Sequence, residues 1–370
     1  MAETETIAYF GARLFDGFAL AADRALVVED GRVAAIVPIG ERPRGARQVD
    51  LGGGVLSPGF VDWQVNGGDG VLFNADPTPE GIAKIAAAHR AAGTTTIVPT
   101  VITDEMRVLD AALSAARAAG TPIHVEGPFL DVRRKGVHRA DFIRPMLDED
   151  VATLIAARAG SMIVTLAPSV TSLAHIAALA KSGIVVSLGH SESTAEQAFA
   201  AFDAGARAVT HIFNAMSQMS AREPGLVGAA LARREIVCGL IADGFHAADA
   251  AMTVALTAKG AGGIALVSDS MPTAAGGPNS FILQGRTIKR ERGRLTDNSG
   301  TLAGADIVMR DAVVYCATKL GTPLAAALEM ATATPARLLG LDSSVGTLIP
   351  GAKAELVHLS DSLDVIAVLV

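Results

Sequence analysis

Several short apolar runs of this chain end on polar residues that can bind a metal or move a proton. His190 and His211 each close a run just before a turn, and neutral imidazole suits zinc and similar ions. Glu126 ends another run, where a carboxylate without a cation or several donors would be costly to bury. Asp269 ends a fourth, and a carboxylate there can take a proton from activated water and return it to a leaving group. One carboxylate and two imidazoles predict a three-ligand site with an open position, as in a catalytic zinc centre.

Each of these residues also has an ordinary structural interpretation. A lone histidine is more often hydrogen-bonded in a core than bound to a metal, Glu126 suits a structural ion pair, and Asp269 suits a helix cap. The residues lie far apart in the sequence. The metal site therefore depends on a fold that gathers strand ends at one point.

The middle of the chain predicts such a fold. From Pro58 to about Gly340, apolar runs alternate with Ala-rich stretches of helical period, such as 78–93, 105–120 and 194–206. The eight runs are GFVDWQVN, TTTIVPTV, PIHVEGPF, MIVTLAPS, IVVSLGHS, AVTHIFNA, VCGLIADG and IALVSDSM. Eight βα units favour a (β/α)8 TIM-like barrel, whose active site lies at the carboxyl ends of its strands. An open doubly wound sheet is the alternative, but no GxGxxG opens a helix after the first run.

Both ends of the chain read as β structure. Two β-branched runs surround an Asp30-Gly31 turn, a strong hairpin signal, and the last thirty residues contain similar short runs. We therefore predict a small β-sandwich domain from residues 1–57 and 341–370, beside a barrel from residues 58–340.

Composition limits the functional classes. The 370 residues are 50% hydrophobic, with a formal charge of −7 and a pI near 5.6, which argues against a nucleic-acid or anionic-membrane surface. Mean hydropathy is +0.39, yet no apolar run approaches the roughly 18 residues of a membrane span. The first ten residues do not resemble a secretory signal. Cys238 and Cys316 predict reduced thiols, so we expect a cytoplasmic protein.

An ordered set of phrases carries a family resemblance. It comprises SPGFVDWQVNG, HVEGPF followed by KGVH, LAPS, LGHS, THIFNAM, REPGLVGA, IADGFH, VSDSM, TLAG and ATATPARLLG. Over nearly its whole length the chain resembles the amidohydrolase superfamily and, within it, a group of amino-sugar-phosphate deacetylases. The resemblance implies metal-dependent hydrolysis of the acetamido group of N-acetyl-D-glucosamine 6-phosphate, giving glucosamine 6-phosphate and acetate.

The resemblance also implies roles for individual residues. Glu126, His190 and His211 correspond to metal ligands and Asp269 to the catalytic acid and base. In the mechanism that we expect, His138 also acts as a catalytic residue, close to the developing oxyanion. The histidine matching His246 reaches the sugar phosphate of a neighbouring subunit, which implies a homodimer. Substrate contacts are expected at Gln64, Asn66, Val137, His138, Asn214, Ala215, Arg222, Asp243, Gly244, Phe245, His246, Leu302, Ala303 and Gly304.

Two departures from the wider superfamily reduce the expected number of metals. Most members carry His-x-His at the end of strand one, where this chain has Gln64 and Asn66, which are weaker ligands. The fourth run also lacks the lysine that some relatives carbamylate. We therefore expect one divalent metal per subunit, and zinc is the expected ion.

The sequence also suggests supporting residues, a basic loop near the site and rival functions. Asp62 and His124 lie two residues before Gln64 and Glu126, so strand periodicity makes them supports of the site. The basic loop 133–135 is either solvated, a mobile lid or a phosphate-attracting rim. Rival functions are another amidohydrolase reaction, such as deamination or cyclic-amide hydrolysis, and a non-catalytic scaffold.

Overall fold

Eight parallel strands form the centre of the computed structural model, which describes residues 5–369. They follow one another around the sheet in chain order, and each corresponds to one of the eight apolar runs of the sequence. The last strand returns to the first through a bridge between Val65 and Ser270 and a hydrogen bond from Asp269 N to Gln64 O at 3.0 Å. The predicted (β/α)8 barrel is therefore confirmed. Its strands are β8 (Phe60–Val65), β11 (Thr94–Ile102), β12 (Ile123–Glu126), β13 (Met162–Leu166), β14 (Val185–Leu188), β15 (Ala208–Val209), β16 (Val237–Leu240) and β17 (Ile264–Leu266).

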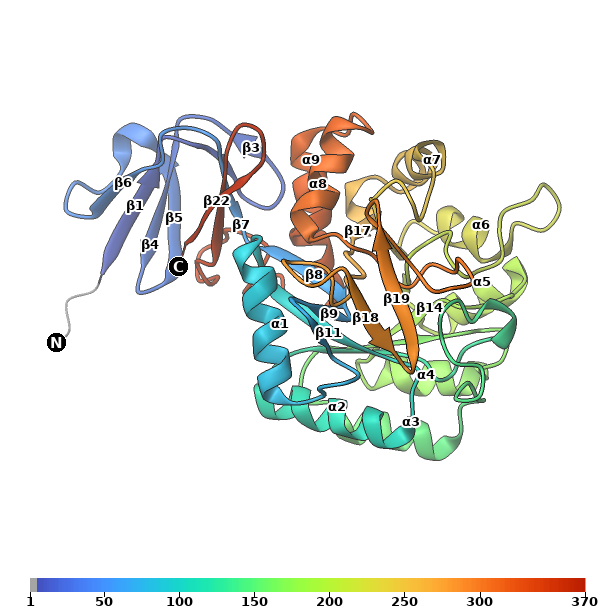
Figure 1. Cartoon of the computed structure of the whole chain (residues 1–370). Coiled ribbons are helices and arrows are strands. Elements are labelled where there is room, and N and C mark those ends of the chain that lie inside the picture. Colours follow the sequence, from blue (N-terminus) through green and yellow to red (C-terminus); the bar gives the residue numbers. More distant parts are fainter. Residues whose placement is uncertain (1–4, 370) are drawn as a thin grey trace.

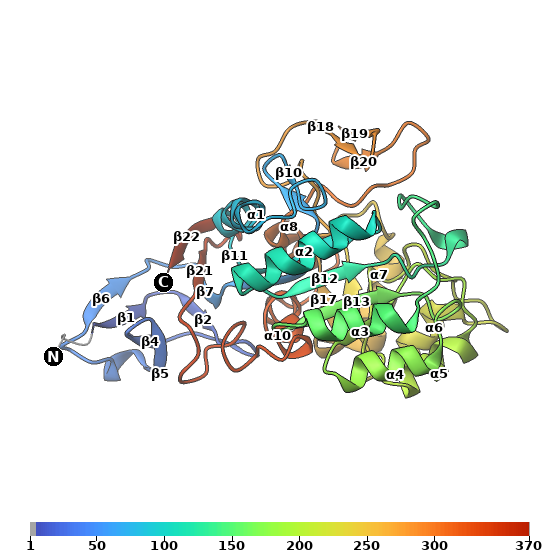
Figure 2. The same ribbon diagram turned by 90° about the horizontal axis from the view of Figure 1, so that it is seen from below.

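Helices cover the outside of the barrel (Figures 1 and 2). Two of the three expected helices begin at capping threonines: Thr78 accepts from Gly81 N, and Thr194 forms a capping box with Gln197. Gly120 ends its helix with a φ of 63°, in the left-handed region that glycine adopts without strain. The α-helices are α1 (Pro79–Ala91), α2 (Met106–Ala119), α3 (Asp148–Ala157), α4 (Leu173–Lys181), α5 (Ala195–Asp203), α6 (Gly225–Ala232), α7 (Asp249–Lys259), α8 (Met309–Thr318), α9 (Leu324–Ala331) and α10 (Ala333–Leu338), and the 3-10 turns are η1 (Ile39–Glu41), η2 (Val132–Arg134) and η3 (Ala261–Gly263).

Two small sheets form the domain at the other end of the molecule (Figure 1). One contains β1 (Thr6–Phe10), β4 (Arg24–Glu29), β5 (Arg32–Pro38) and β6 (Arg47–Asp50). The other joins β2 (Arg13–Phe15), β3 (Leu20–Ala21) and β7 (Val55–Pro58) to β21 (Leu356–Leu359) and β22 (Val365–Leu369). The β-sandwich built from both termini is thus confirmed, whereas its exact boundaries at 57/58 and 340/341 stay a prediction.

A third sheet follows the last barrel strand and has no counterpart in the eight-unit pattern. It consists of β18 (Ser280–Leu283), β19 (Arg286–Glu291) and β20 (Arg294–Thr296), and it stands apart from the barrel layer beside the short pair β9 (Gly67–Gly68) and β10 (Val71–Leu72) (Figure 2). Leu283, Ile288 and Leu295 are buried in one apolar cluster with Leu72, Ile102, Val137, Met271 and Ala303. This cluster attaches the sheet, called the cap sheet below, to the barrel mouth.

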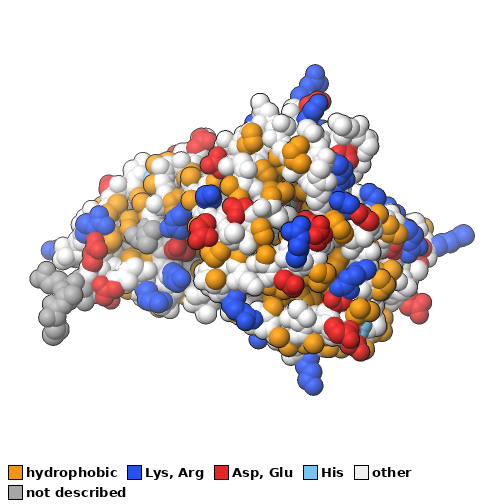
Figure 3. Space-filling model, turned by 60° about the horizontal axis from the view of Figure 1, so that its bottom comes forward, with side chains coloured by type: hydrophobic (Ala, Val, Ile, Leu, Met, Phe, Trp, Pro, Cys, Tyr) orange, Lys and Arg blue, Asp and Glu red, His pale blue; other side chains and the backbone are white. Residues whose placement is uncertain are grey.

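Charges of both signs are mixed on the face of the molecule that Figure 3 shows. Figure 3 shows basic and acidic side chains interspersed over one face, without a continuous basic area. No helix within residues 5–369 is long and apolar enough to cross a membrane.

Candidate active site

The backbone turns sharply at the strand ends that hold the candidate ligands. Glu126 is the last residue of β12, while His190, His211 and Asp269 follow β14, β15 and β17. The last three have φ of 46°, 33° and 48°, values that residues other than glycine rarely adopt and that cost about 1–3 kcal/mol each. This strain is typical of functional sites, where the surrounding structure holds a side chain in one required direction.

Three donor atoms meet at one point above the barrel axis. Glu126 Oε1 lies 3.1 Å from His190 Nε2 and 3.0 Å from His211 Nε2, and the two imidazole nitrogens lie 3.1 Å apart. Ligands of a tetrahedral zinc are roughly 3.3 Å apart, since zinc bonds to nitrogen and oxygen are about 2.0–2.1 Å long. The spacing therefore fits one small divalent ion.

The hydrogen bonding of His190 and the charge of Glu126 also favour a metal ion at this point. His190 Nδ1 lies 2.9 Å from the carbonyl oxygen of Arg134 and must donate to it, which leaves a lone pair on Nε2 of the neutral ring. Burial opposes the charge of Glu126, but its contacts with the imidazoles of His190 and His211 hold its pKa well below the usual range. A lone pair facing an ionised carboxylate calls for a cation between them, so these residues fit a metal.

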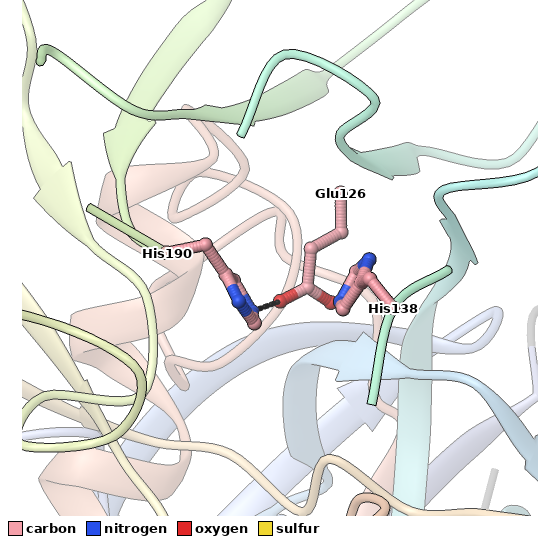
Figure 4. A group of neighbouring side chains, drawn as sticks. All are labelled: Glu126, His138 and His190. Carbon is pink, nitrogen blue, oxygen red and sulfur yellow. Dashed lines mark hydrogen bonds and ion pairs between the residues drawn. The ribbon is translucent and has the colours of Figure 1, made fainter. Parts of the chain in front are cut away.

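His138 lies on the other side of the Glu126 carboxylate from His190 (Figure 4). A ligand atom of each of the three residues falls within 4.8 Å of the others, so His138 is a second candidate for the third ligand position. His211 fits that position better because its Nε2 touches both Glu126 and His190. His138 Nδ1 is instead held by Thr103 Oγ1 at 2.9 Å. Burial keeps the pKa of His138 well below its ordinary value, and the neutral ring lines the cavity.

Asp269 faces this group and is held by two amides. Its Oδ1 accepts from Asn66 Nδ2 at 2.7 Å and from Gln64 Nε2 at 3.1 Å, and Gln64 Nε2 also reaches Glu126 Oε2 at 3.2 Å. Gln64 and Asn66 thus act here as hydrogen-bond donors that orient two carboxylates. Burial, followed by the charge of Glu126, raises the pKa of Asp269 to about 6. A carboxylate with such a pKa can both accept and return a proton near neutral pH.

A cavity of about 500 Å³ opens over these residues, a size that holds a small-molecule ligand. Its wall includes twelve of the predicted site residues: Asn66, Glu126, Val137, His138, His190, His211, Asn214, Ala215, His246, Asp269, Leu302 and Gly304. Gln64 lies beneath the wall, and Arg222, Asp243, Gly244, Phe245 and Ala303 lie outside it. The substrate contacts expected of all these residues, inside the wall or outside it, stay predictions. The wall of the chain's own cavity also contains His246, so its predicted reach into a neighbouring subunit stays a prediction too.

The loop after β12 is fixed to its neighbours. The buried Asp131 carboxylate accepts from the backbone and guanidinium of Arg133, from Ser169 Oγ at 2.8 Å and from Glu192 N at 3.4 Å, and Asp131 N donates to His190 O at 2.9 Å. Arg134 pairs with Glu192. The basic loop 133–135 therefore forms a fixed wall of the cavity, because each of its two arginines is paired with a carboxylate. The contacts of the Asp131 carboxylate are called the clasp below.

A buried polar layer supports the site from below. His124 bonds Thr100 and Thr165, and Thr165 continues through Thr210 to Ser187. Asp62 accepts from Gln64 N and Ser268 N. Both side chains lie under the candidate ligands, where strand periodicity placed them. Burial raises the pKa of Asp62 to about 7 and lowers that of His124 to about 4.

The chain matches a known protein family over most of its length. The model of the amidohydrolase family matches residues 55–370. The chain belongs to the amidohydrolase family. An N-acetylgalactosamine-6-phosphate deacetylase of Shewanella sp. (strain ANA-3) is 38% identical over 86% of this chain and 82% of its own length. An N-acetylglucosamine-6-phosphate deacetylase of Haemophilus influenzae is 34% identical over 94% and 93%.

Solved structures of the amidohydrolase family show the same architecture. The N-acetylglucosamine-6-phosphate deacetylase of Pasteurella multocida superposes with a TM-score of 0.95 at 32% identity, covering 99% of this chain and 98% of its own. Some residues around the site were not predicted from the sequence. Thr103 and Asp131 are the main ones, and neither had a local signal in the sequence.

Proposed function

We propose that the chain hydrolyses the acetamido group of N-acetyl-D-glucosamine 6-phosphate to glucosamine 6-phosphate and acetate. The observation that carries the proposal is the meeting of Glu126, His190 and His211 beside Asp269 at the floor of one cavity. Deacetylases of 6-phosphorylated N-acetyl sugars are its relatives over most of the chain. The complete set of ligand-type and proton-transfer residues also argues against a non-catalytic scaffold.

The chain's own residues supply the steps of an amide hydrolysis. A divalent ion held by Glu126, His190 and His211 would supply Lewis-acid chemistry and make water more acidic. Asp269, oriented by Asn66 and Gln64, takes the proton of the attacking water and delivers it to the departing amine. His138, fixed by Thr103, lines the cavity beside the reacting carbonyl. The walls that carry these groups bind the sugar and limit the access of water.

The proposal includes one zinc per subunit. One oxygen and two nitrogen donors suit zinc, and the amides of Gln64 and Asn66 are engaged with carboxylates instead of forming a second histidine site. Elemental analysis of carefully purified protein should give one tightly bound equivalent. Two tightly bound equivalents would contradict this part of the proposal.

A second candidate substrate is the C4 epimer, N-acetyl-D-galactosamine 6-phosphate. The relative with 38% identity is named for that substrate, and both epimers present the same acetamido and phosphate groups. We give the gluco epimer priority because the Pasteurella multocida structure, which agrees over almost the whole chain, carries its name.

Acetate release tests the function directly. The purified enzyme is assayed with both 6-phosphorylated epimers, with unphosphorylated N-acetylglucosamine and with a cyclic amide, each with and without a chelator. We expect chelator-sensitive release that is fastest with the gluco 6-phosphate. Absence of release from both phosphorylated sugars, or a strong preference for the cyclic amide, would reject the proposal.

The proposed enzyme is a cytoplasmic homodimer. Exposed apolar side chains support the dimer: Met219 and Phe245 are 58% and 43% exposed on the loops after the neighbouring strands β15 and β16. Two buried free thiols, Cys238 and Cys316, support a reducing compartment. Sedimentation of the purified protein at twice the monomer mass is the expected result for the dimer.

A further inference from the structure

We propose that Thr103 is a positioning residue for His138: its hydroxyl donates to Nδ1 of the ring, so that Nε2 carries the proton and donates into the cavity. The inference rests on the proposed function and deepens it, because it states what makes His138 a hydrogen-bond donor to the oxygen of the amide that is hydrolysed. The family resemblance assigned no role to Thr103.

The hydroxyl of Thr103 has two neighbours and one proton to give. Its Oγ1 lies 2.9 Å from His138 Nδ1 and 3.3 Å from the backbone oxygen of Glu126. A hydrogen bond from a hydroxyl to an oxygen is about 2.5–3.0 Å long, so the contact with the Glu126 oxygen is too long to hold the proton. The ring of His138 is the better acceptor, and it receives the proton of Thr103 on Nδ1.

The two histidines on either side of the Glu126 carboxylate differ in the partner of Nδ1 (Figure 4). His190 Nδ1 faces the carbonyl oxygen of Arg134 at 2.9 Å, which can only accept, whereas His138 Nδ1 faces a hydroxyl, which can donate. Because a neutral imidazole carries a single N–H, His190 presents a lone pair from Nε2 and His138 presents a proton. The lone pair suits a metal ligand, and the proton suits a donor to a developing oxyanion.

The Nε2 atom of His138 is free for such a donation. The residue is only 3% exposed, and its ring lines the cavity. Within residues 5–369, Nε2 has no hydrogen-bond partner, whereas Nδ1 is occupied by Thr103. Because a buried N–H without an acceptor is costly, this proton favours an oxygen in the cavity, and the acetamido group of the substrate supplies one.

The surrounding chain holds Thr103 in the place that this bond requires. Gln284 Nε2, in the turn between β18 and β19 of the cap sheet, donates to Thr103 O at 2.7 Å. The amide of Asn74 pairs with both backbone groups of Ile102, at 2.9 and 3.0 Å. Gly127 leaves room for the hydroxyl, because a Cβ there would lie 2.1 Å from Thr103 Oγ1. The hydroxyl is thus fixed beside the ring, and a β-branched side chain keeps it there.

The first test compares three variants in the acetate assay. Thr103→Val removes the hydroxyl and keeps the shape of the side chain, so the ring can take either tautomer. We expect kcat to fall roughly 10- to 100-fold with KM unchanged, less than the about 10²–10³-fold cost of losing a whole oxyanion donor. Thr103→Ser keeps the hydroxyl and should retain most of kcat. Thr332→Val is the control, since this equally buried hydroxyl donates to Leu328 O at 2.7 Å outside the cavity wall, and it should leave kcat unchanged.

A double variant separates a role through His138 from a general loosening of the site. In His138→Ala there is no ring to orient, so the addition of Thr103→Val should not lower kcat further. An equal loss of kcat in both backgrounds would overturn the inference. The same holds if Thr103→Ser is as slow as Thr103→Val.

The position of the proton is measured without turnover, by nitrogen-15 NMR of protein labelled at its histidine rings. The signals of His138 are assigned by their loss in His138→Ala. We expect a protonated Nε2 and an unprotonated Nδ1 in the wild type, and a mixture of tautomers in Thr103→Val. A proton on Nδ1 in the wild type would overturn the inference even if acetate is released. Failure of the proposed function would appear instead as absence of acetate release with the proton on Nε2.

Discussion

In the proposed mechanism Asp269 transfers the proton, and the amides of Asn66 and Gln64 orient its carboxylate. Because Asn66 and Gln64 can only donate through their nitrogens, they hold the Asp269 carboxylate in one orientation. Residue types at strand ends were enough to predict that Asp269 and the three candidate ligands lie together. They did not reveal what the amides contact, because that depends on side chains more than sixty residues away.

Substitution of Asp269 by Asn tests the proton-transfer role. The variant keeps an oxygen that can accept from Asn66 but has no basic group, so kcat should fall by about 10²–10⁴-fold, while metal content stays at one equivalent. Acetate release and elemental analysis measure the two quantities. Asp361→Asn, at a side chain 84% exposed, is the matched control, and turnover by Asp269→Asn near the wild-type rate would remove the residue from its role.

Asp62 makes stability depend on pH. Burial raises its pKa from 3.8 to about 7, so the folded chain keeps a proton that the unfolded chain loses near pH 4. The free energy of unfolding should therefore fall as pH rises from about 4 to about 7, by at most about 1.4 kcal/mol per pH unit from this group.

Asp62→Asn should lack this contribution. Urea unfolding of both proteins at a series of pH values, with saturating zinc, isolates it as the difference between the two curves. Parallel curves across pH 4–7 would show that Asp62 titrates normally in the folded protein.

At the scale of elements, the strands were predictable and the loops were not. Each barrel strand is an apolar run bounded by turn residues, which is a local pattern. All eight strands could therefore be predicted from the sequence. The cap sheet does not, because its place is set by Leu283 and Ile288 packing against Leu72 and Met271. The clasp at Asp131 likewise depends on Ser169 and on the backbone of Glu192, which only the folded barrel brings near.

Removal of that clasp should weaken the metal site without touching a ligand. In Asp131→Ala the loop loses its tie to β13 and β14, so Arg134 O no longer fixes the ring of His190. Loss of such support typically lowers metal affinity about 10- to 100-fold, which chelator competition measures.

Asp141→Ala is the control for the Asp131 experiment, since Asp141 forms a comparable pair with Arg139 on the exposed part of the same loop. An unchanged zinc affinity in Asp131→Ala would show that the clasp only shapes the cavity wall.

At the scale of the whole molecule, the site belongs to the barrel, and the small domain contributes stability. Leu356, fully buried on β21, packs with Ile7, Leu14 and Leu26 in the core of that domain. Leu356→Ala should lower the free energy of unfolding by about 2–5 kcal/mol and leave kcat unchanged. Ile366→Ala, at a side chain 58% exposed, should change neither in unfolding and acetate assays. A large loss of kcat in Leu356→Ala would mean that the small domain helps to shape the site.

The pairing of β7 with β21 has a consequence for the newborn chain. β7 pairs with β2 along one edge and, among residues 5–369, with Leu356–Leu359 along the other. During translation, β7 leaves the ribosome long before β21 is synthesised. The edge of β7 that will pair with β21 therefore stays unpaired until the whole barrel has emerged. An unfilled edge can recruit a strand from another nascent chain. Early assembly of the barrel, which holds β7 and β21 at neighbouring places, is what would keep this pairing within one molecule.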